Sequence, residues 1–332
     1  MNKVLVIGMG QLGKCIRDAY QVYLKNLSDS ESPVISIDFA TRMPEDNTII
    51  DIDITDKDDF LKVVKDKGYT FIVNCAAYTN VNSANSNDEK TQLECMRLNR
   101  DCLRHIAEFC EDNGCNLIHV STDYVFSGRD GLVRENSQKF HPMNFYGKSK
   151  REGEDILPKY MGVNGKYMII RTSSLYSQYG SNFVKTMIKK FEVNENVSVI
   201  MDNVSSPTNA NDFAHMIVNH ILVPFGKGEK EIENGAWHFT NEGIISWYDF
   251  AQAILEEYIK NVGPSTSKII ATDSETVINA AADRGEVVVD RPMASILSKD
   301  KLKSEGYEIK YWKTSLNEFF VSQYNTLANE GK

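Results

Sequence analysis

Short apolar runs alternate with amphipathic stretches through the first half of the chain. Five of these runs read as buried strands, at residues 3–7, 34–37, 48–52, 70–74 and 116–120. The stretches between them repeat their apolar residues every three or four positions, which is typical of helices, most clearly at 11–27 and about 88–113. Continuous apolar strands that alternate with helices predict an α/β fold with a doubly wound parallel sheet.

The pattern becomes less regular after a sixth strand-like run at 167–170. Helical spacing recurs near 182–191, 211–222 and 247–258, while 264–289 shows mixed signals. We therefore expect residues 1–175 to form a nucleotide-binding Rossmann domain, with a later return segment at about 197–222. Residues 176–332 would form mainly a smaller substrate-binding lid over the carboxyl edge of the sheet.

A glycine-rich turn separates the first strand from the first helix. Glycine lets the backbone turn tightly and approach a pyrophosphate, which the free N–H groups at the start of the helix can bind. In this strand–turn–helix context the sequence favours a dinucleotide site over a purely structural turn. The candidate pyrophosphate-binding residues are Gly8, Gly10, Gln11, Leu12 and Gly13.

Further cofactor contacts are expected where the next strands end. Asp38 follows the second strand, where an acid can bind the ribose hydroxyls and favour NAD(H) over NADP(H). Arg42 lies four residues on and could offset this preference, so NADH and NADPH both stay open. Residues at the ends of the third and fourth strands would accommodate the adenine and the crossing cofactor: Asp51, Ile52, Ala76 and Ala77.

Thr122, Tyr146 and Lys150 are the candidate catalytic residues. Thr122 ends the fifth strand, where its hydroxyl can hydrogen-bond a substrate carbonyl. Tyr146 and Lys150 are four residues apart and share one helix face. Because a lysine cation lowers the pKa of a nearby phenol, Tyr146 can exchange a proton with a carbonyl oxygen, and Lys150 can also hold the nicotinamide ribose. Asn99 is a candidate for fixing Lys150 through a water, with an ordinary polar helix position as the alternative.

The overall composition limits the classes of partner that we expect the chain to bind. The chain of 332 residues has a formal net charge of −9, which argues against nucleic acid or an anionic membrane as the main partner. No apolar run approaches the ~18 residues that a membrane helix needs. The six cysteines form no CxxC pair, which is typical of free thiols in a cytoplasmic protein. The sequence shows no ligand spacing for a metal site.

Several motifs taken together resemble a known family. The glycine loop and residues 74–79 (NCAAYT), 121–126 (STDYVF) and 146–150 (YGKSK) are similar to those of extended short-chain dehydrogenases/reductases. The later motifs resemble, more narrowly, the dTDP-4-dehydrorhamnose reductase family: residues 171–173 (RTS), 182–187 (NFVKTM), 206–208 (SPT), 246–251 (SWYDFA) and 291–292 (RP).

The resemblance implies NAD(P)H-dependent reduction of the 4-keto group of a dTDP-4-keto-6-deoxy sugar, giving dTDP-L-rhamnose. By position, the three candidate catalytic residues keep that role, Tyr124 would approach the sugar, and Arg291 could meet the diphosphate. Mg²⁺ is sometimes associated with the family, although this sequence offers no ligand cluster for it. A homodimer is the assembly that we would expect, and the sequence does not fix it.

Ser174 departs from the family pattern, which usually has a tryptophan lining the sugar pocket at this position. The change leaves the identity of the sugar open. Two other interpretations also stay open. One is an epimerase or dehydratase of nucleotide sugars, although Asp123 and Tyr124 follow Thr122 where a dehydratase would carry an Asp-Glu pair. The other is a cofactor-binding regulatory homologue without catalysis.

Overall fold

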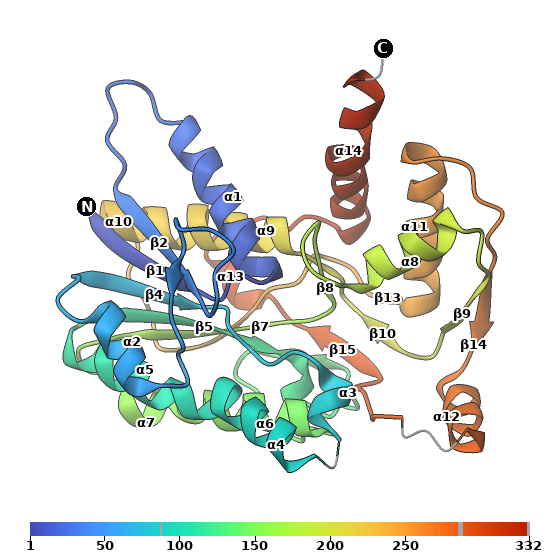
Figure 1. The fold of residues 1–332 in the computed structure, drawn as a ribbon, viewed down its shortest axis with the longest axis horizontal. Helices are drawn as coiled ribbons and strands as arrows, with labels where there is room; N and C mark the ends of the chain where they lie inside the picture. Colours follow the sequence, from blue (N-terminus) through green and yellow to red (C-terminus); the bar gives the residue numbers. More distant parts are fainter. Residues whose placement is uncertain (87, 285–287, 331–332) are drawn as a thin grey trace.

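The centre of the molecule is a parallel sheet with helices on both faces (Figure 1). The computed structural model describes residues 1–86, 88–284 and 288–330. Over these residues the sheet has seven strands in the order β12-β7-β5-β4-β1-β2-β3, and every neighbouring pair is parallel. The strands are β1 (Asn2–Ile7), β2 (Ile35–Thr41), β3 (Ile50–Asp51), β4 (Tyr69–Asn74), β5 (Asn116–Thr122), β7 (Tyr167–Thr172) and β12 (Gly235–His238).

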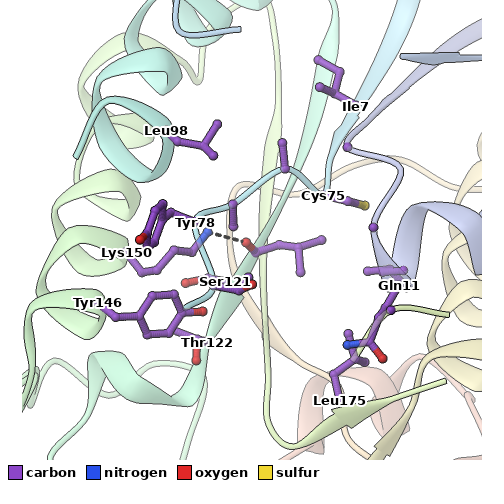
Figure 2. A pocket seen from close by; sticks show the side chains of 18 of the residues that line it. Ile7, Gln11, Cys75, Tyr78, Leu98, Ser121, Thr122, Tyr146, Lys150 and Leu175 are labelled. Atoms are coloured by element: carbon purple, nitrogen blue, oxygen red, sulfur yellow. Dashed lines mark hydrogen bonds between the residues drawn. The ribbon is translucent and has the colours of Figure 1, made fainter. Parts of the chain in front are cut away.

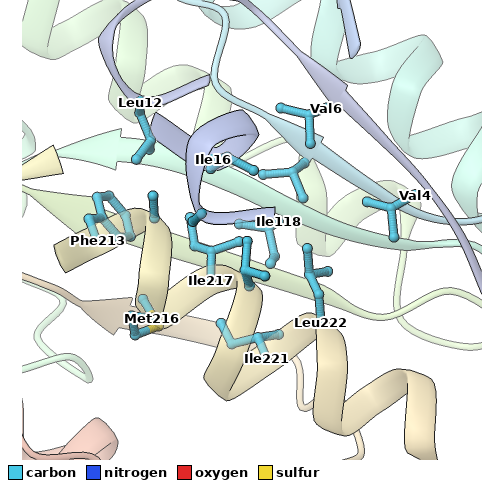
Figure 3. Packing of buried hydrophobic residues seen from close by; sticks show 14 of the residues in the cluster. Val4, Val6, Leu12, Ile16, Ile118, Phe213, Met216, Ile217, Ile221 and Leu222 are labelled. Carbon is cyan, nitrogen blue, oxygen red and sulfur yellow. The ribbon is translucent and has the colours of Figure 1, made fainter. Parts of the chain in front are cut away.

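The alternating side chains of the strands feed two separate hydrophobic layers. Val4 and Val6 of β1 pack with α1 and α9, as Figure 3 shows, whereas Leu5 and Ile7 pack on the opposite face. One face carries α1 (Gln11–Lys25), α9 (Ala210–His215), a π-helical segment (Met216–Leu222) and α10 (Val223–Lys227). The other carries α2 (Lys57–Val64), α5 (Cys102–Asp112) and α7 (Leu157–Tyr160). The predicted doubly wound α/β fold is therefore confirmed.

The long helix expected at about 88–113 forms with one irregularity. Asp88 caps it, and it runs through α4 (Glu89–Met96), a π-helical segment (Arg97–Asp101) and α5. A π-helical turn inserts an extra residue and is frequent at functional sites. Here the turn carries Asn99 toward α6 (Phe145–Glu154).

The C-terminal lobe has its own hydrophobic core. Helices α8 (Phe183–Glu192), α11 (Trp247–Asn261) and the first part of α14 (Trp312–Glu330) pack against the strand pair β9 (Val197–Ile200) and β14 (Ile269–Thr272). Two smaller sheets join the lobes, formed by β13 (Ile245–Ser246), β10 (Val204–Ser205), β15 (Ala294–Leu297) and β6 (Leu132–Val133), and by β11 (Thr208–Asn209) and β8 (Leu175–Tyr176). The remaining helices are α3 (Val81–Ala84), α12 (Ser274–Asp283) and α13 (Asp300–Ser304).

The residues that bring the chain back to the large sheet differ from the segment expected at about 197–222. Residues 197–200 form β9, which pairs with β14 and stays in the C-terminal lobe. The return begins at Ala210 and extends further, because β12 pairs with β7 at the edge of the sheet. Strand β12 was not predicted because it has only four residues, among them the buried Trp237, and so short an apolar pattern does not indicate a strand.

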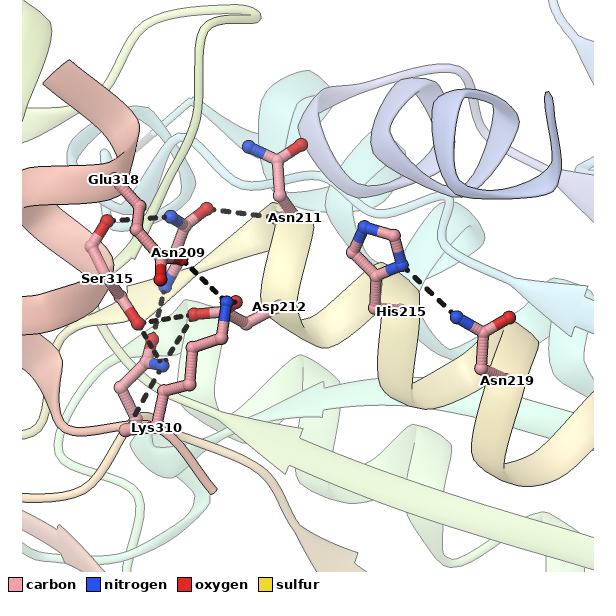
Figure 4. A network of polar contacts seen from close by, with 9 residues as sticks. Asn209, Asn211, Asp212, His215, Asn219, Lys310, Ser315 and Glu318 are labelled. Carbon is pink, nitrogen blue, oxygen red and sulfur yellow. Dashed lines mark hydrogen bonds and ion pairs between the residues drawn. The ribbon is translucent and has the colours of Figure 1, made fainter. Parts of the chain in front are cut away.

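A polar network fastens α14 to the Rossmann half (Figure 4). Asp212 of α9 accepts hydrogen bonds from Ser315 Oγ at 2.5 Å and from Asn241 Nδ2 at 2.8 Å, and its other oxygen pairs with Lys310 at 3.2 Å. Asn209 Nδ2 donates to the Ser315 carbonyl at 3.2 Å. The network fixes the lobe that covers the sheet edge. No helix in the described part of the chain is both long and apolar enough to cross a membrane.

Candidate active site

A cavity of about 1070 Å³ follows the carboxyl ends of the central strands (Figure 2). Its walls come from the β1–α1 turn, the ends of β2, β4 and β5, helix α6 and the segment after β7. This is where ligands bind in doubly wound sheets. The cavity brings together twelve of the predicted site residues: Gly8, Gly10, Gln11, Leu12, Ile52, Ala76, Ala77, Thr122, Tyr124, Tyr146, Lys150 and Ser174.

The three glycines of the β1–α1 turn have different physical roles. Gly8 has φ +93°, and a Cβ there would lie 2.5 Å from the Ala76 nitrogen, so the turn itself requires glycine. A Cβ on Gly13 would lie 2.1 Å from the Gly8 carbonyl oxygen, so Gly13 packs beneath the turn rather than on the cavity wall. A Cβ on Gly10 would meet only open space, on the cavity side of a helix start that has no side-chain cap. Open space beside uncapped N–H groups fits the pyrophosphate of a dinucleotide.

Asp38 does not lie on the cavity, contrary to the prediction. Strand β2 continues for three more residues because Phe39 and Ala40 are buried in the two hydrophobic layers. Asp38 therefore lies within the strand, where it accepts a hydrogen bond from Tyr69 Oη at 2.7 Å and pairs with Lys3 at 3.0 Å. Asp51 is also outside the cavity. Its carboxylate accepts a hydrogen bond from the Met43 backbone N–H at 2.9 Å.

The true end of β2 brings a cation to the cavity instead. Thr41 and Arg42 line the wall there, together with Asp53 after β3. The Arg42 side chain is 70% exposed, and its Nη1 lies 3.5 Å from Asp53 Oδ2. A guanidinium at this position offers a bidentate donor for a phosphate group. Phe39 and Ala40 continue the apolar run after Asp38, although the run alone does not show that both are buried in the strand.

The catalytic candidates meet because α6 packs very closely against the end of β5. Asn144 caps the helix by accepting from the Gly147 N–H at 2.8 Å. A Cβ on Gly147 would lie 2.2 Å from the Tyr124 carbonyl oxygen, and only glycine permits this approach. Tyr146 thereby comes beside Thr122 (Figure 2), whose hydroxyl donates to Asp123 Oδ1 at 3.0 Å.

Burial dominates the acid–base properties of the two α6 residues. It raises the pKa of Tyr146 above its ordinary value, although the Thr122 hydrogen bond acts in the opposite direction. Burial also lowers the pKa of Lys150 to about 8, against the opposing charge of Glu154. Lys150 Nζ lies 2.8 Å from the Val120 carbonyl oxygen and 3.1 Å from His119 Nε2.

Asn99 is buried and braces the helix rather than Lys150. Its amide accepts from the Tyr78 N–H at 2.8 Å and donates to the Tyr78 carbonyl at 3.1 Å and to Ser149 Oγ at 2.9 Å. A water-mediated link from Asn99 to Lys150 stays a prediction. Sequence reasoning missed His119, because a single histidine inside an apolar strand carries no local pattern.

Of the predicted substrate residues, Tyr124 and Ser174 line the cavity and Arg291 does not. The Tyr124 and Tyr146 rings form an edge-to-face pair with centroids 5.6 Å apart. Arg291 is exposed just outside the cavity wall, where it hydrogen-bonds the Tyr124 hydroxyl and donates to Asn82 Oδ1 at 3.2 Å. Ser174 lies on the wall in the left-handed region, at φ +47°, and its Oγ is 2.8 Å from Ser205 Oγ. A small hydroxyl thus stands where an aromatic side chain would narrow the pocket.

Comparisons with known proteins agree with this geometry. The chain matches the family model described as the RmlD substrate binding domain over residues 2–325. It is 31% identical to a dTDP-4-dehydrorhamnose reductase of Aggregatibacter actinomycetemcomitans, over 85% of this chain and 90% of that protein. It is 32% identical to a dTDP-4-keto-6-deoxy-D-glucose reductase of Streptomyces niveus, over 81% of this chain and 85% of that protein.

A solved structure adds the evidence of shape. The dTDP-4-dehydrorhamnose reductase of Bacillus anthracis, in complex with NADP, has a TM-score of 0.75 and 29% identity, with 97% of this chain and 100% of that chain covered. The family match and the shared fold extend over nearly the whole chain, and the two relatives cover more than four fifths of it. The chain therefore belongs to the RmlD substrate-binding-domain family, the dTDP-4-dehydrorhamnose reductases of the extended short-chain dehydrogenase/reductase superfamily.

Proposed function

We propose that this chain uses NADPH to reduce the 4-keto group of a dTDP-4-keto-6-deoxy sugar, giving dTDP-L-rhamnose. The observation that carries the proposal is one cavity that joins the open Gly10 turn to Thr122, Tyr146 and Lys150. The named activities of the relatives supply the substrate class.

The side chains around the cavity divide the work of a carbonyl reduction. Bound NADPH would supply the hydride to the carbonyl carbon. Tyr146 protonates the sugar oxygen, and its raised pKa keeps the phenol in the donor form near neutral pH. Thr122 hydrogen-bonds the same oxygen, and the cationic form of Lys150 stabilises the phenolate that proton transfer leaves on Tyr146.

The proposal is tested by following NADPH oxidation with the dTDP-4-keto-6-deoxy sugar. Removing the phenol hydroxyl in Tyr146→Phe should lower kcat by ~10²–10⁴-fold, the usual contribution of a positioned proton donor. NADPH binding should remain within about threefold of the native protein, since the ring stays in place. Tyr248→Phe is the matched control, because Tyr248 hydrogen-bonds Gln252 away from the cavity. Undiminished turnover by Tyr146→Phe would refute the assigned role.

The preference for NADPH over NADH rests on Arg42. An exposed guanidinium on the cavity wall attracts a 2′-phosphate, while Asp38 is held within β2 by Lys3 and Tyr69. A parallel measurement of kcat/KM with both cofactors tests this preference.

The hexose is the least constrained part of the substrate. The two relatives are named for differently described 4-keto sugars, and Ser174 leaves the pocket wall open. Both sugars belong in the same assay. Absence of turnover with either, together with stable association with a partner enzyme, would favour a regulatory homologue. The cytoplasmic location and the homodimer stay predictions.

A further inference from the structure

Three polar side chains lie buried behind the cavity, between β4, β5 and α6. Asn74 is the last residue of β4, His119 is in the middle of β5, and Lys150 is on α6. Each is at most 1% exposed. His119 contacts both of the others, with Nε2 3.1 Å from Lys150 Nζ and Nδ1 3.4 Å from Asn74 Nδ2. The reduction chemistry above does not use His119 or Asn74.

The orientation of the Asn74 amide fixes the tautomer of His119. The backbone N–H of Ala76 can only donate, and it points to Asn74 Oδ1 at 3.1 Å. The NH₂ group of Asn74 therefore faces His119, and it too can only donate. His119 Nδ1 must accept this bond, so the imidazole is neutral and carries its proton on Nε2. Burial agrees with a neutral ring, since it lowers the pKa of His119 well below the ordinary value.

The Nε2–H of His119 then points at the Lys150 nitrogen. An ammonium has three N–H donors and no lone pair, whereas a neutral amine has one lone pair that can accept. Lys150 also donates to the Val120 carbonyl oxygen at 2.8 Å. Both contacts are satisfied together only when Lys150 is a neutral amine.

The contacts of the other titratable groups around Lys150 leave His119 as the side chain that decides between the ammonium and the neutral amine. The Glu154 carboxylate is already held by two hydrogen bonds from Arg171, at 2.9 and 2.7 Å. Three thiols face the amine, Cys75 after β4, Cys95 on α4 and Cys102 on α5, and burial raises the pKa of each. The thiols therefore stay neutral and place no negative charge beside Lys150. Lys150 can offer a lone pair to His119 only after it has lost its own proton.

We propose that Asn74 and His119 are positioning residues that favour the neutral amine of Lys150 in the cofactor-free protein, so that cofactor binding in alkaline solution takes up a proton from solvent at Lys150. The ribose hydroxyls of a bound cofactor would accept hydrogen bonds from the Lys150 ammonium, whereas the Nε2–H of His119 cannot accept one. This inference rests on the proposed function, in which Lys150 faces the nicotinamide ribose.

The test is calorimetric titration of the full chain with NADPH, without sugar, in buffers that differ in ionisation enthalpy. Uptake should be about half a proton per site near pH 8, where the free amine is half ionised, and approach one proton near pH 9. The 2′-phosphate, with a pKa of about 6, contributes nothing in this range. The affinity for NADPH should fall toward tenfold per pH unit above pH 8. Binding without proton uptake at pH 8 and 9 would overturn the inference.

Two variants remove the Nε2–H donor from Lys150 by different routes. In His119→Gln, an unconstrained amide can turn its oxygen to the ammonium, so uptake near pH 8 should fall to less than half of the native value. In Asn74→Asp, the carboxylate accepts from both Ala76 and Nδ1–H, which leaves Nε2 free to accept from the ammonium. The same fall is expected there. Native proton uptake in both variants would contradict the proposed effect of Asn74 and His119 on Lys150.

His105→Gln is the matched control. His105 is also buried, but its Nε2 bonds the Ile54 carbonyl at 2.8 Å, away from Lys150. It should keep native proton uptake. The measurement separates the two claims, because NADPH binding with proton uptake but no sugar turnover would sink only the proposed function. Binding and turnover without uptake would sink only this inference.

Discussion

The two ends of the cavity are built by opposite means. At the catalytic end, α6 is pressed against β5 with no room for a side chain at Gly147, and Lys150 is 1% exposed. At the nucleotide end, Gly10 faces open space and the Arg42 side chain is 70% exposed. The catalytic end is therefore shaped by the same contacts that fold the protein. At the nucleotide end, Gly10 and Arg42 border space that the fold leaves free, so substitutions at these two positions should alter binding without altering stability.

Gly10→Val is the strongest test of the open end. Gly10 has φ −78°, which valine adopts without strain, and its Cβ would meet no neighbour. The added methyl groups would occupy the space beside the helix N-terminus, where the pyrophosphate is expected. NADPH affinity should fall by roughly 100-fold or more, which corresponds to about 3 kcal/mol.

The melting temperature measured alongside decides what the loss means. It should stay within about 2 °C of the native value for Gly10→Val, since a surface change without a clash has little effect on stability. A variant that binds NADPH normally would show that the pyrophosphate lies elsewhere.

Gly147→Ala is the corresponding test of the packed end. Alanine favours a helix over glycine by about 1 kcal/mol, so an unpacked helix would gain stability. Here the Cβ would lie 2.2 Å from the backbone oxygen of Tyr124, which cannot rotate away. We expect a net loss of about 1–3 kcal/mol in the free energy of unfolding, as for other overpacked sites. Denaturant unfolding measures it.

Turnover should fall together with stability in this variant, because the shift separates Tyr146 from Thr122. Gly263→Ala is the control, since its Cβ would meet open space and its unfolding free energy should change by less than about 0.5 kcal/mol. A stabilised Gly147→Ala protein would contradict the close contact.

The catalytic end was predictable from sequence because its rules are local. Tyr146 and Lys150 share a helix face by spacing alone, and Thr122 follows from the end of a strongly apolar strand. His119 could not be found in this way. Its partners come from positions 45 residues before it and 31 residues after it, and only the register of β4, β5 and α6 brings them together.

The nucleotide end was misread because it depends on where a strand stops. Asp38 interrupts an apolar run and looks like its end, yet Phe39 and Ala40 continue the strand into two hydrophobic layers. Whether a strand continues past one polar residue is decided by the packing on its two faces. Sequence periodicity over seven residues does not contain that information.

Arg42→Ala is the mildest expected change and tests this corrected strand end. Loss of the guanidinium should raise KM for NADPH about tenfold and leave KM for NADH nearly unchanged, because an exposed charge–phosphate contact is partly screened by water. The preference should also weaken as salt rises. Arg104→Ala is the control, since Arg104 is similarly exposed at 63% and pairs with Glu108 away from the cavity. Equal losses with both cofactors would show that Arg42 contacts a part that they share.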